Sequence, residues 1–439
     1  MKIRENDFFI WFFSSLVSVV LGSVNVFGLD LTREQVVQYA LANSEMVRIQ
    51  EMVEKESALG IIAARSSSLP RIDFSANYDR NWRLPSFVFN GTSVTMGSEN
   101  DMRTAVGLRQ AIFSGGRNGA SKNIAEYSYL GSKSKGKAIR QTVVVQAELA
   151  FYDVLAAIEL ASVSYLALKN ARESLNLIKA TRAVGRGSTF EELRARGQVS
   201  SMEADSIVAV NNILLTRLNL KSIIGLDSET EINIKGDLFR SSVWQNIAVD
   251  SLVTVALKMR PDLRAMRQNL RTHEQIIRLE KSARWPVLDF VMAGQAQMQS
   301  DRLVDKNAKW RKNWSTGLTL RIPVFDGFLT RSRIGQARMK SEAIFYEISI
   351  LRKKIKLEVE TSLRRIDEAV ARVKSGKQVL IEAEKANEMA HSRYSTGVGT
   401  QLEILDAQLF LVRTKTNLAL ARRDRAIGLL ELDRSLGLL

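Results

Sequence analysis

The chain has 439 residues, of which 45% are hydrophobic and only 5 are proline, a composition typical of a folded protein with long helices. It contains no cysteine, which excludes disulfides, zinc–thiolate sites and a lipid anchor on cysteine, and its two histidines lie too far apart in sequence to suggest a metal site. The net charge of +16 would suit a nucleic acid or an anionic membrane surface, but the basic residues are spread along helical faces, so we expect no nucleic-acid partner.

The N-terminus predicts a signal peptide over residues 1–28. Lys2 and Arg4 precede an apolar run at 8–22, and small residues follow up to Gly28. The alternative, an N-terminal membrane anchor, is disfavoured because the run is shorter than the roughly 20 residues that a spanning helix needs. No later segment has 18 uninterrupted apolar residues, so we expect no transmembrane helix in the mature chain.

An internal duplication organises the rest of the chain. The stretch GRGSTFEEL at 185–193 returns as GVGTQLEIL at 397–405, and TAVGLRQAIFSGG at 104–116 matches TGLTLRIPVFDGF at 316–328. This period is too long for a solenoid. We therefore predict two homologous halves, residues 29–228 and 251–439, joined by a linker at 229–250.

Each half begins with a predicted helix, at 32–67 and 251–282, and then changes to a period of two residues. This alternation predicts strands near 70–83, 103–113, 286–299 and 314–325. Strands of about 10 residues with one apolar face are typical of transmembrane β-strands, although a half-buried soluble sheet has the same pattern. The connections at 85–101 and 300–313 are polar and predict loops.

Four charged residues lie on the polar side of these strands. Asp73, Arg109, Asp289 and Arg321 all point away from the apolar faces and repeat between the halves. We expect a cross-strand or near-neighbour contact between Asp73 and Arg109 and another between Asp289 and Arg321, both facing the interior of a barrel.

A very long helix follows each strand pair. The segments 117–183 and 327–393 contain no proline, and 60-odd helical residues span roughly 100 Å. Each helix ends at the repeated motif, with turns near 185–188 and 397–400, where Gly185 and Gly397 can adopt the left-handed conformation. Ser188 and Thr400 can cap the returning helix, and the glutamate three residues later completes a capping box in each half.

A chain with four strands cannot close a membrane barrel alone, because the smallest barrels have about eight strands and an open edge is not stable in lipid. Three copies would supply twelve. The chain resembles the TolC family of outer-membrane efflux proteins, on fragments that occur in the family's order along essentially all of the mature sequence. These fragments are VVQYALANSEMV, SLPRIDFSANY, QAIFSGGRN, MRPDLRA, RIPVFDG, RYSTGVGTQLEILDAQ and SLGLL.

The resemblance implies a mostly α fold with a membrane β-barrel: a homotrimer with a 12-stranded barrel, four strands per chain, continued by a long α-helical barrel. It implies an outer-membrane protein in contact with lipid that extends into the periplasm as the exit duct of a tripartite efflux or type I secretion system. A periplasmic adaptor (membrane fusion) protein and an inner-membrane RND or ABC transporter are the implied partners. It implies no enzyme activity and no cofactor, and it leaves open whether drugs, metals or proteins are carried.

The resemblance also marks candidate sites. At the periplasmic entrance the family's acidic positions match Glu403 and Asp406, its tyrosine matches Tyr394, and its partner acidic position matches Glu191. Arg194 is a chemically sensible partner for Asp406. The adaptor-docking turns match Val184, Gly185, Arg186, Thr396, Gly397 and Val398.

Other interpretations remain open at this point. Gly399 stands where the family often has an arginine, and Glu191 and Glu403 could serve only as helix caps. A secreted or surface coiled-coil scaffold without a channel is the alternative function, and a nucleic-acid-binding rod is suggested only by the charge. We find no nucleophile–base motif, no phosphate-binding loop and no carboxylate pair in a cleft, so an enzyme is disfavoured.

Overall fold

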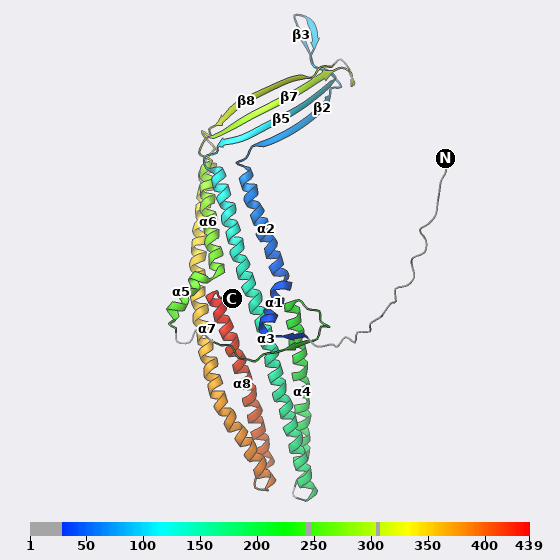
Figure 1. Cartoon of the computed structure of the whole chain (residues 1–439), viewed down its shortest axis with the longest axis vertical. Coiled ribbons are helices and arrows are strands. Elements are labelled where there is room, and N and C mark those ends of the chain that lie inside the picture. The colour runs from blue at the N-terminus through cyan, green and yellow to red at the C-terminus, as the bar shows by residue number, and fades with distance from the viewer. Residues whose placement is uncertain (1–28, 186, 242–246, 304–307) are drawn as a thin grey trace, which may run out of the picture.

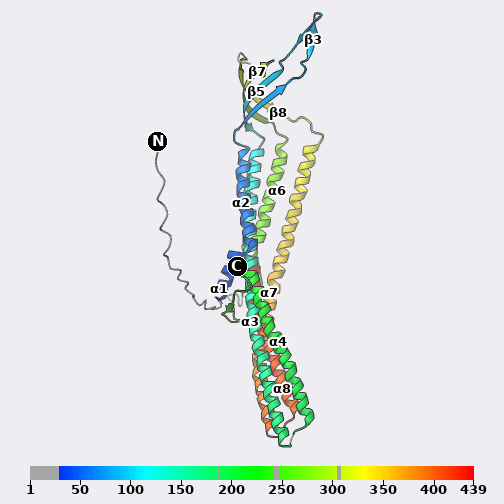
Figure 2. The same cartoon turned by 90° about the vertical axis from the view of Figure 1, so that its right-hand side faces the viewer.

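The structure is a computed structural model that describes residues 29–185, 187–241, 247–303 and 308–439. The predicted signal peptide at 1–28 lies outside the described residues. A curved four-stranded sheet forms one end of an elongated molecule, and two helical hairpins form the other (Figure 1). Turned by 90°, the helices form a thin layer below the sheet (Figure 2).

The first half contains two short helices, the first strands and a long helical hairpin. Its elements are β1 (Leu29–Leu31), α1 (Arg33–Asn43), α2 (Glu45–Ser66), β2 (Arg71–Arg80), β3 (Ser86–Phe89), β4 (Thr92–Thr95), β5 (Asn100–Phe113), α3 (Arg117–Ala183) and α4 (Thr189–Ile224).

The second half repeats the order of a short strand, two shorter helices, two strands of the main sheet and a long helical hairpin, which confirms the predicted two-fold repeat. Its elements are β6 (Ile232–Ile234), α5 (Val249–Met259), α6 (Pro261–Ser282), β7 (Val287–Ser300), β8 (Arg311–Arg321), α7 (Leu329–Ser395) and α8 (Gln401–Leu436). The long helices α3 and α7 each have 67 residues, and the returning helices α4 and α8 each have 36.

The main sheet is antiparallel with the order β2-β5-β7-β8. Its register places Phe74 opposite Val106, Leu108 opposite Met292, and Phe290 opposite Leu318, so apolar side chains share one face. Because successive residues of a strand point to opposite faces, the other face is polar. The sheet therefore presents one apolar and one polar surface.

A second, unpredicted hairpin projects beyond the far end of the sheet (Figure 1). Strands β3 and β4 pair around Asn90 and Gly91, whose φ angles of 47° and 77° are typical of a type I′ turn. The prediction of a loop over 85–101 was wrong here, because Asn90-Gly91 is a strong hairpin-turn signal and the aromatic and β-branched residues on either side of it favour strands.

The middle of the molecule holds a core in which both halves meet. Phe151 and Tyr152 of α3 pack with Leu31, Leu220 and Ile234, and Ala426 of α8 joins the same cluster. The parallel strands β1 and β6 lie beside it, with Leu29 opposite Ile232. The start of the described chain and the inter-repeat segment are thus fixed at the same level.

Among the described residues, one helix is long and apolar enough to cross a membrane by length and composition, namely α4. Only 11% of its most apolar window is buried in the single chain. The sequence had predicted no such helix, because Asn, Thr, Arg and Lys interrupt this window. We interpret its apolar side chains as packing surface, since α4 runs along α3 as one arm of a hairpin.

Candidate functional site

The first helical turn has the predicted capping geometry. Gly185 has a φ of 78°, Ser188 accepts a hydrogen bond from the Phe190 amide, and the Glu191 carboxylate accepts one from the Ser188 amide at 3.2 Å. Glu191 is therefore engaged as a helix cap. Arg186, one of the predicted docking residues, lies outside the described residues.

The second turn differs from its repeat. Thr400 caps α8 by accepting from the Glu403 amide at 3.3 Å, but the Glu403 carboxylate accepts from Arg393 Nε at 3.1 Å instead of completing the capping box. The prediction of a second capping box was wrong. A charged guanidinium is a stronger donor than a neutral amide, and the first repeat has Thr181 at the position of Arg393.

Gly399 is required by the tight backbone of this turn. A Cβ atom at this position would lie 2.9 Å from the Tyr394 amide nitrogen and 3.0 Å from the Arg393 carbonyl carbon. Any larger residue, including the arginine that the family often has, would force the backbone to shift. Glycine at this position therefore allows the backbone to turn this tightly.

Tyr394 joins the two hairpin tips by packing. Its side chain is 8% exposed and clusters with Ile178 of α3, Ala195 of α4 and Ile404 of α8. Burial raises the pKa of Tyr394 above its ordinary value, and the negative charge of Glu191 adds to the rise. Within the described ranges the buried hydroxyl has no hydrogen-bond partner, so Tyr394 acts here as an apolar contact.

Polar contacts that the sequence analysis missed also connect the tips. Gln401 donates to the Glu191 carbonyl at 2.8 Å, and Gln408 donates to Ser174 Oγ at 2.7 Å. Nε2 of His391 lies 3.1 Å from the same Gln408 amide. The spacing of seven residues between the two glutamines places both on one face of α8. This spacing is the sequence feature that could have predicted a polar contact between the tips.

The predicted Asp406–Arg194 pair does not form within one chain. Both side chains are exposed, and neither makes an ion pair with another residue that the structure describes. The buried carboxylate of this region is instead Glu192, which is 5% exposed and binds Arg182 and Arg196. The hydrogen bond from Arg182 lowers the pKa of Glu192, and that from Arg196 adds to this effect.

The four predicted barrel residues share the polar face but not the predicted contacts. Asp73 lies opposite Gly107 and Arg109 lies opposite Arg71, so the two are displaced by two positions, and Asp73 accepts from Arg71 at 3.0 Å instead. Asp289 lies opposite Thr319, and Arg321 opposite Val287. The expected cross-strand or near-neighbour contacts were wrong, because the sequence pattern fixes the face of a strand but not its register.

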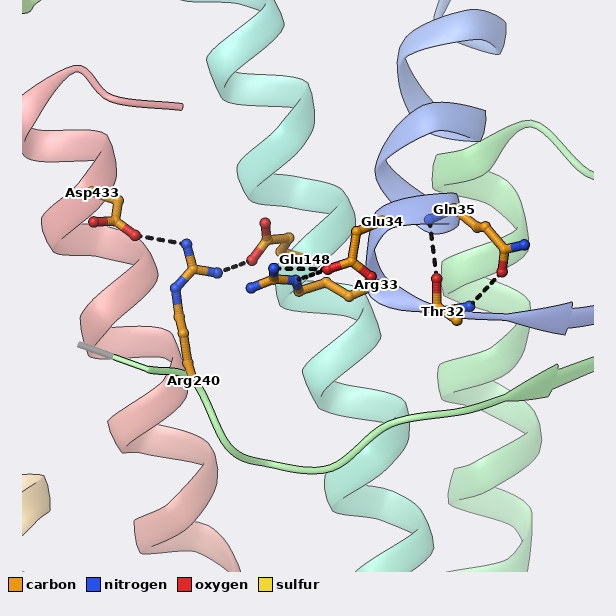
Figure 3. Close-up of polar contacts among 7 residues, drawn as sticks. All are labelled: Thr32, Arg33, Glu34, Gln35, Glu148, Arg240 and Asp433. Carbon is orange, nitrogen blue, oxygen red and sulfur yellow. Dashed lines mark hydrogen bonds and ion pairs between the residues drawn. The ribbon is translucent and has the colours of Figure 1, made fainter. Parts of the chain in front are cut away.

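A buried charge cluster holds the inter-repeat segment against both long hairpins (Figure 3). Arg240 forms an ion pair with Glu148 of α3 and donates to Asp433 of α8 at 2.7 Å. Burial raises the pKa of Glu148, and the charge of Arg240 offsets part of this rise. Burial opposes the charged form of Arg240, but the hydrogen bond to Asp433 and the charge of Glu148 raise its pKa overall.

The family assignment follows from a match that repeats with the halves. The model of the family described as outer membrane efflux protein matches residues 36–226 and again 252–438. The chain belongs to this family. It is an outer-membrane efflux channel protein, and the alternative of a coiled-coil scaffold is not supported.

Curated relatives match along nearly the whole chain. Outer membrane protein TolC of Escherichia coli is 23% identical over 92% of this chain and 82% of its own length. Outer membrane protein OprJ of Pseudomonas aeruginosa is 24% identical over 94% of this chain and 85% of its own length. The solvent efflux pump outer membrane protein SrpC of Pseudomonas putida is 24% identical over 96% of this chain and 88% of its own length.

Solved structures have the same fold. The outer membrane protein VceC of Vibrio cholerae superposes with a TM-score of 0.81 at 17% identity, covering 92% of this chain and 96% of that one. A membrane protein from Pseudomonas aeruginosa gives a TM-score of 0.80 at 21% identity, covering 92% of this chain and 93% of that one.

Proposed function

We propose that three copies of this chain close a 12-stranded barrel in the outer membrane and an α-helical barrel below it, forming the exit duct of an efflux pump. The observation that carries the proposal is the sheet itself. Strands β2 and β8 each have one edge without a partner in the sheet, and every residue of both strands is exposed. Unpaired backbone groups are not tolerated in lipid, so these edges must pair with neighbouring copies.

The helical layer also supports an association between copies through its edges. Helices α2 and α7 form its two edges, since α2 contacts α3, α3 contacts α6 and α6 contacts α7. Both edges carry exposed apolar side chains, which water disfavours and a neighbouring copy would cover. Those of α2 include Met46, Ile49, Met52, Leu59 and Ile62, and those of the upper part of α7 include Met339, Phe345, Tyr346 and Ile350.

The helical tips are the proposed periplasmic entrance and docking surface. In a trimer the exposed Asp406 side chains would surround the narrow end, with Glu403 beside them and Arg194 facing a neighbouring copy. The turn residues Val184 and Val398 are 71% and 69% exposed, and such apolar side chains at a tip suit contact with a periplasmic adaptor. An inner-membrane RND or ABC transporter would supply the cargo.

The cargo class is proposed from the relatives. Those named for their cargo carry solvents, toluene or pyoverdine, all of them small molecules. We therefore favour small molecules over whole proteins, and an efflux pump over a type I secretion system. The polar sheet face, which includes Asp73, Arg109, Asp289 and Arg321, would line the wet interior of the barrel.

The test combines mass and conductance. Native mass measurement in detergent should give a trimer, and the purified protein should form ion-conducting pores in planar bilayers. A monomer or dimer that forms no pores would contradict the proposal. Crosslinking in cells, followed by identification of the adaptor and the pump, would then separate an RND partner from an ABC partner.

A further inference from the structure

The β3–β4 hairpin lies in the longest uncharged stretch of residues 29–439. Residues 84–97 contain no Asp, Glu, Lys or Arg, whereas 25% of the whole sequence is charged. Arg83 and Glu99 bound this segment sharply. Its large apolar side chains are mostly exposed in the described chain: Phe89 is 75% exposed and Val88 is 76% exposed.

The hairpin is nevertheless firmly mounted on the end of the sheet. The Asn81 amide donates to the Glu99 carbonyl at 2.7 Å, and Met96 donates to the Pro85 carbonyl at 3.0 Å. The Glu99 amide in turn donates to Asp301 beyond β7 at 3.2 Å. These bonds connect the base of the hairpin to the end of the sheet, and the hairpin extends past the sheet, away from the helices (Figure 2).

The hairpin has one apolar and one hydroxyl-rich face. Phe87 lies opposite Val94, and Phe89 lies opposite Thr92, so these four side chains share one face. The other face carries Ser86, Val88, Ser93 and Thr95. A two-stranded hairpin is marginally stable in water by itself, so an apolar face of this kind needs a partner surface.

We propose that the apolar faces of three β3–β4 hairpins, one from each copy, pack against one another and cap the outer exit of the barrel. This inference rests on the proposed trimeric channel. The hairpin leaves the sheet from β2, the strand that must pair with the next copy, so it stands at the boundary between copies. Three identical uncharged surfaces can meet around one axis without the repulsion that like charges would cause.

The competing occupant, the outer leaflet of the membrane, fits less well. Binding to an anionic lipid surface uses clustered Lys and Arg, and the hairpin has neither. The hairpin also extends beyond the end of the sheet, past the strands whose apolar face would meet lipid (Figure 1).

The absence of cysteine allows a direct test in the full-length protein. Thr92→Cys places a thiol on the apolar face, and the neighbouring Ser93→Cys places one on the hydroxyl face, as a matched control. We expect oxidation of the membrane-inserted trimer to give a covalent dimer for Thr92→Cys and little for Ser93→Cys. A trimeric preparation in which neither variant links, or in which both link equally, would overturn the cap. Absence of trimers would overturn the proposed channel and the cap together.

Two further measurements sharpen the outcome. The Phe87→Ser/Phe89→Ser variant should conduct more than the parent channel in planar bilayers, because it removes the apolar side chains that would hold the cap closed. Unchanged conductance would contradict the cap. If a fluorophore attached to the thiol of the Thr92→Cys variant were quenched by spin labels on lipid chains, the hairpin would be assigned to the membrane and the inference overturned.

Discussion

Arg240 and Glu148 form an ion pair in the middle of the molecule in which both side chains are almost entirely buried. Arg240 comes from the inter-repeat segment, and Glu148 lies on the apolar side of α3 between Ala147 and Ala150. The pair, together with Asp433, joins three parts of the chain that are distant in sequence. A buried pair of this kind is costly to break, because one charge is left without compensation.

Replacing Arg240 should therefore destabilise the protein strongly. We expect Arg240→Met to lower the free energy of unfolding by about 3–5 kcal/mol, measured by denaturant unfolding in detergent. The double variant Arg240→Met/Glu148→Met should lose less, because no buried charge is left unpaired. As an exposed-pair control, Arg172→Met should cost at most about 1 kcal/mol. Equal losses at Arg240 and Arg172 would contradict this account.

The same site predicts a pH dependence. Burial raises the folded-state pKa of Glu148, so the folded protein holds this proton more tightly than the unfolded chain. The contribution of Glu148 to stability is thus full below its unfolded pKa and is lost as the pH rises through its folded pKa. Arg240→Met removes the opposing charge, so its stability should fall more steeply between acidic and neutral pH than that of the parent. Adding Glu148→Gln should remove this extra slope.

Tyr394 should act through its ring and not through its hydroxyl. Tyr394→Phe removes a buried hydroxyl that has no partner in the described chain, so stability should stay equal or rise by about 0–1 kcal/mol. Tyr394→Ala removes the packing between the tips and should cost about 2–4 kcal/mol and raise channel conductance. If Tyr394→Phe opened the channel as much as Tyr394→Ala, the hydroxyl would be bonded to another copy.

Asp406 and Glu403 should differ in their effect on ion selectivity. Asp406 is exposed and unpaired within the described chain, whereas Arg393 neutralises Glu403. In single-channel recordings, Asp406→Asn should reduce the preference for cations clearly, and Glu403→Gln should change it less, since only an unpaired charge contributes fully to the local field. Equal effects would indicate that Arg393 turns away from Glu403 in the assembled channel.

The sequence alone was sufficient to predict the strands and long helices that recur in both halves. The alternation at 70–83 coincides with β2, and the long proline-free segments coincide with α3 and α7. It could not place Asp73 beside Arg71, because strand register depends on the whole sheet. Nor could it pair Arg240 with Glu148, since the segment around Arg240 has no periodicity. The one hint was a glutamate at a helix position where its neighbours Val145 and Phe151 are buried.

The meeting of distant segments at the centre of α3 makes the two repeats depend on each other for a complete core. Strand β1 pairs with Ile232–Ile234, and Arg240 pairs with Asp433 near the end of α8. Gln141 of α3 donates to the carbonyl of Leu439 at 2.9 Å. The central core is therefore complete only when both repeats are present, so a fragment that contains one repeat alone would leave apolar and charged groups of α3 without their partners.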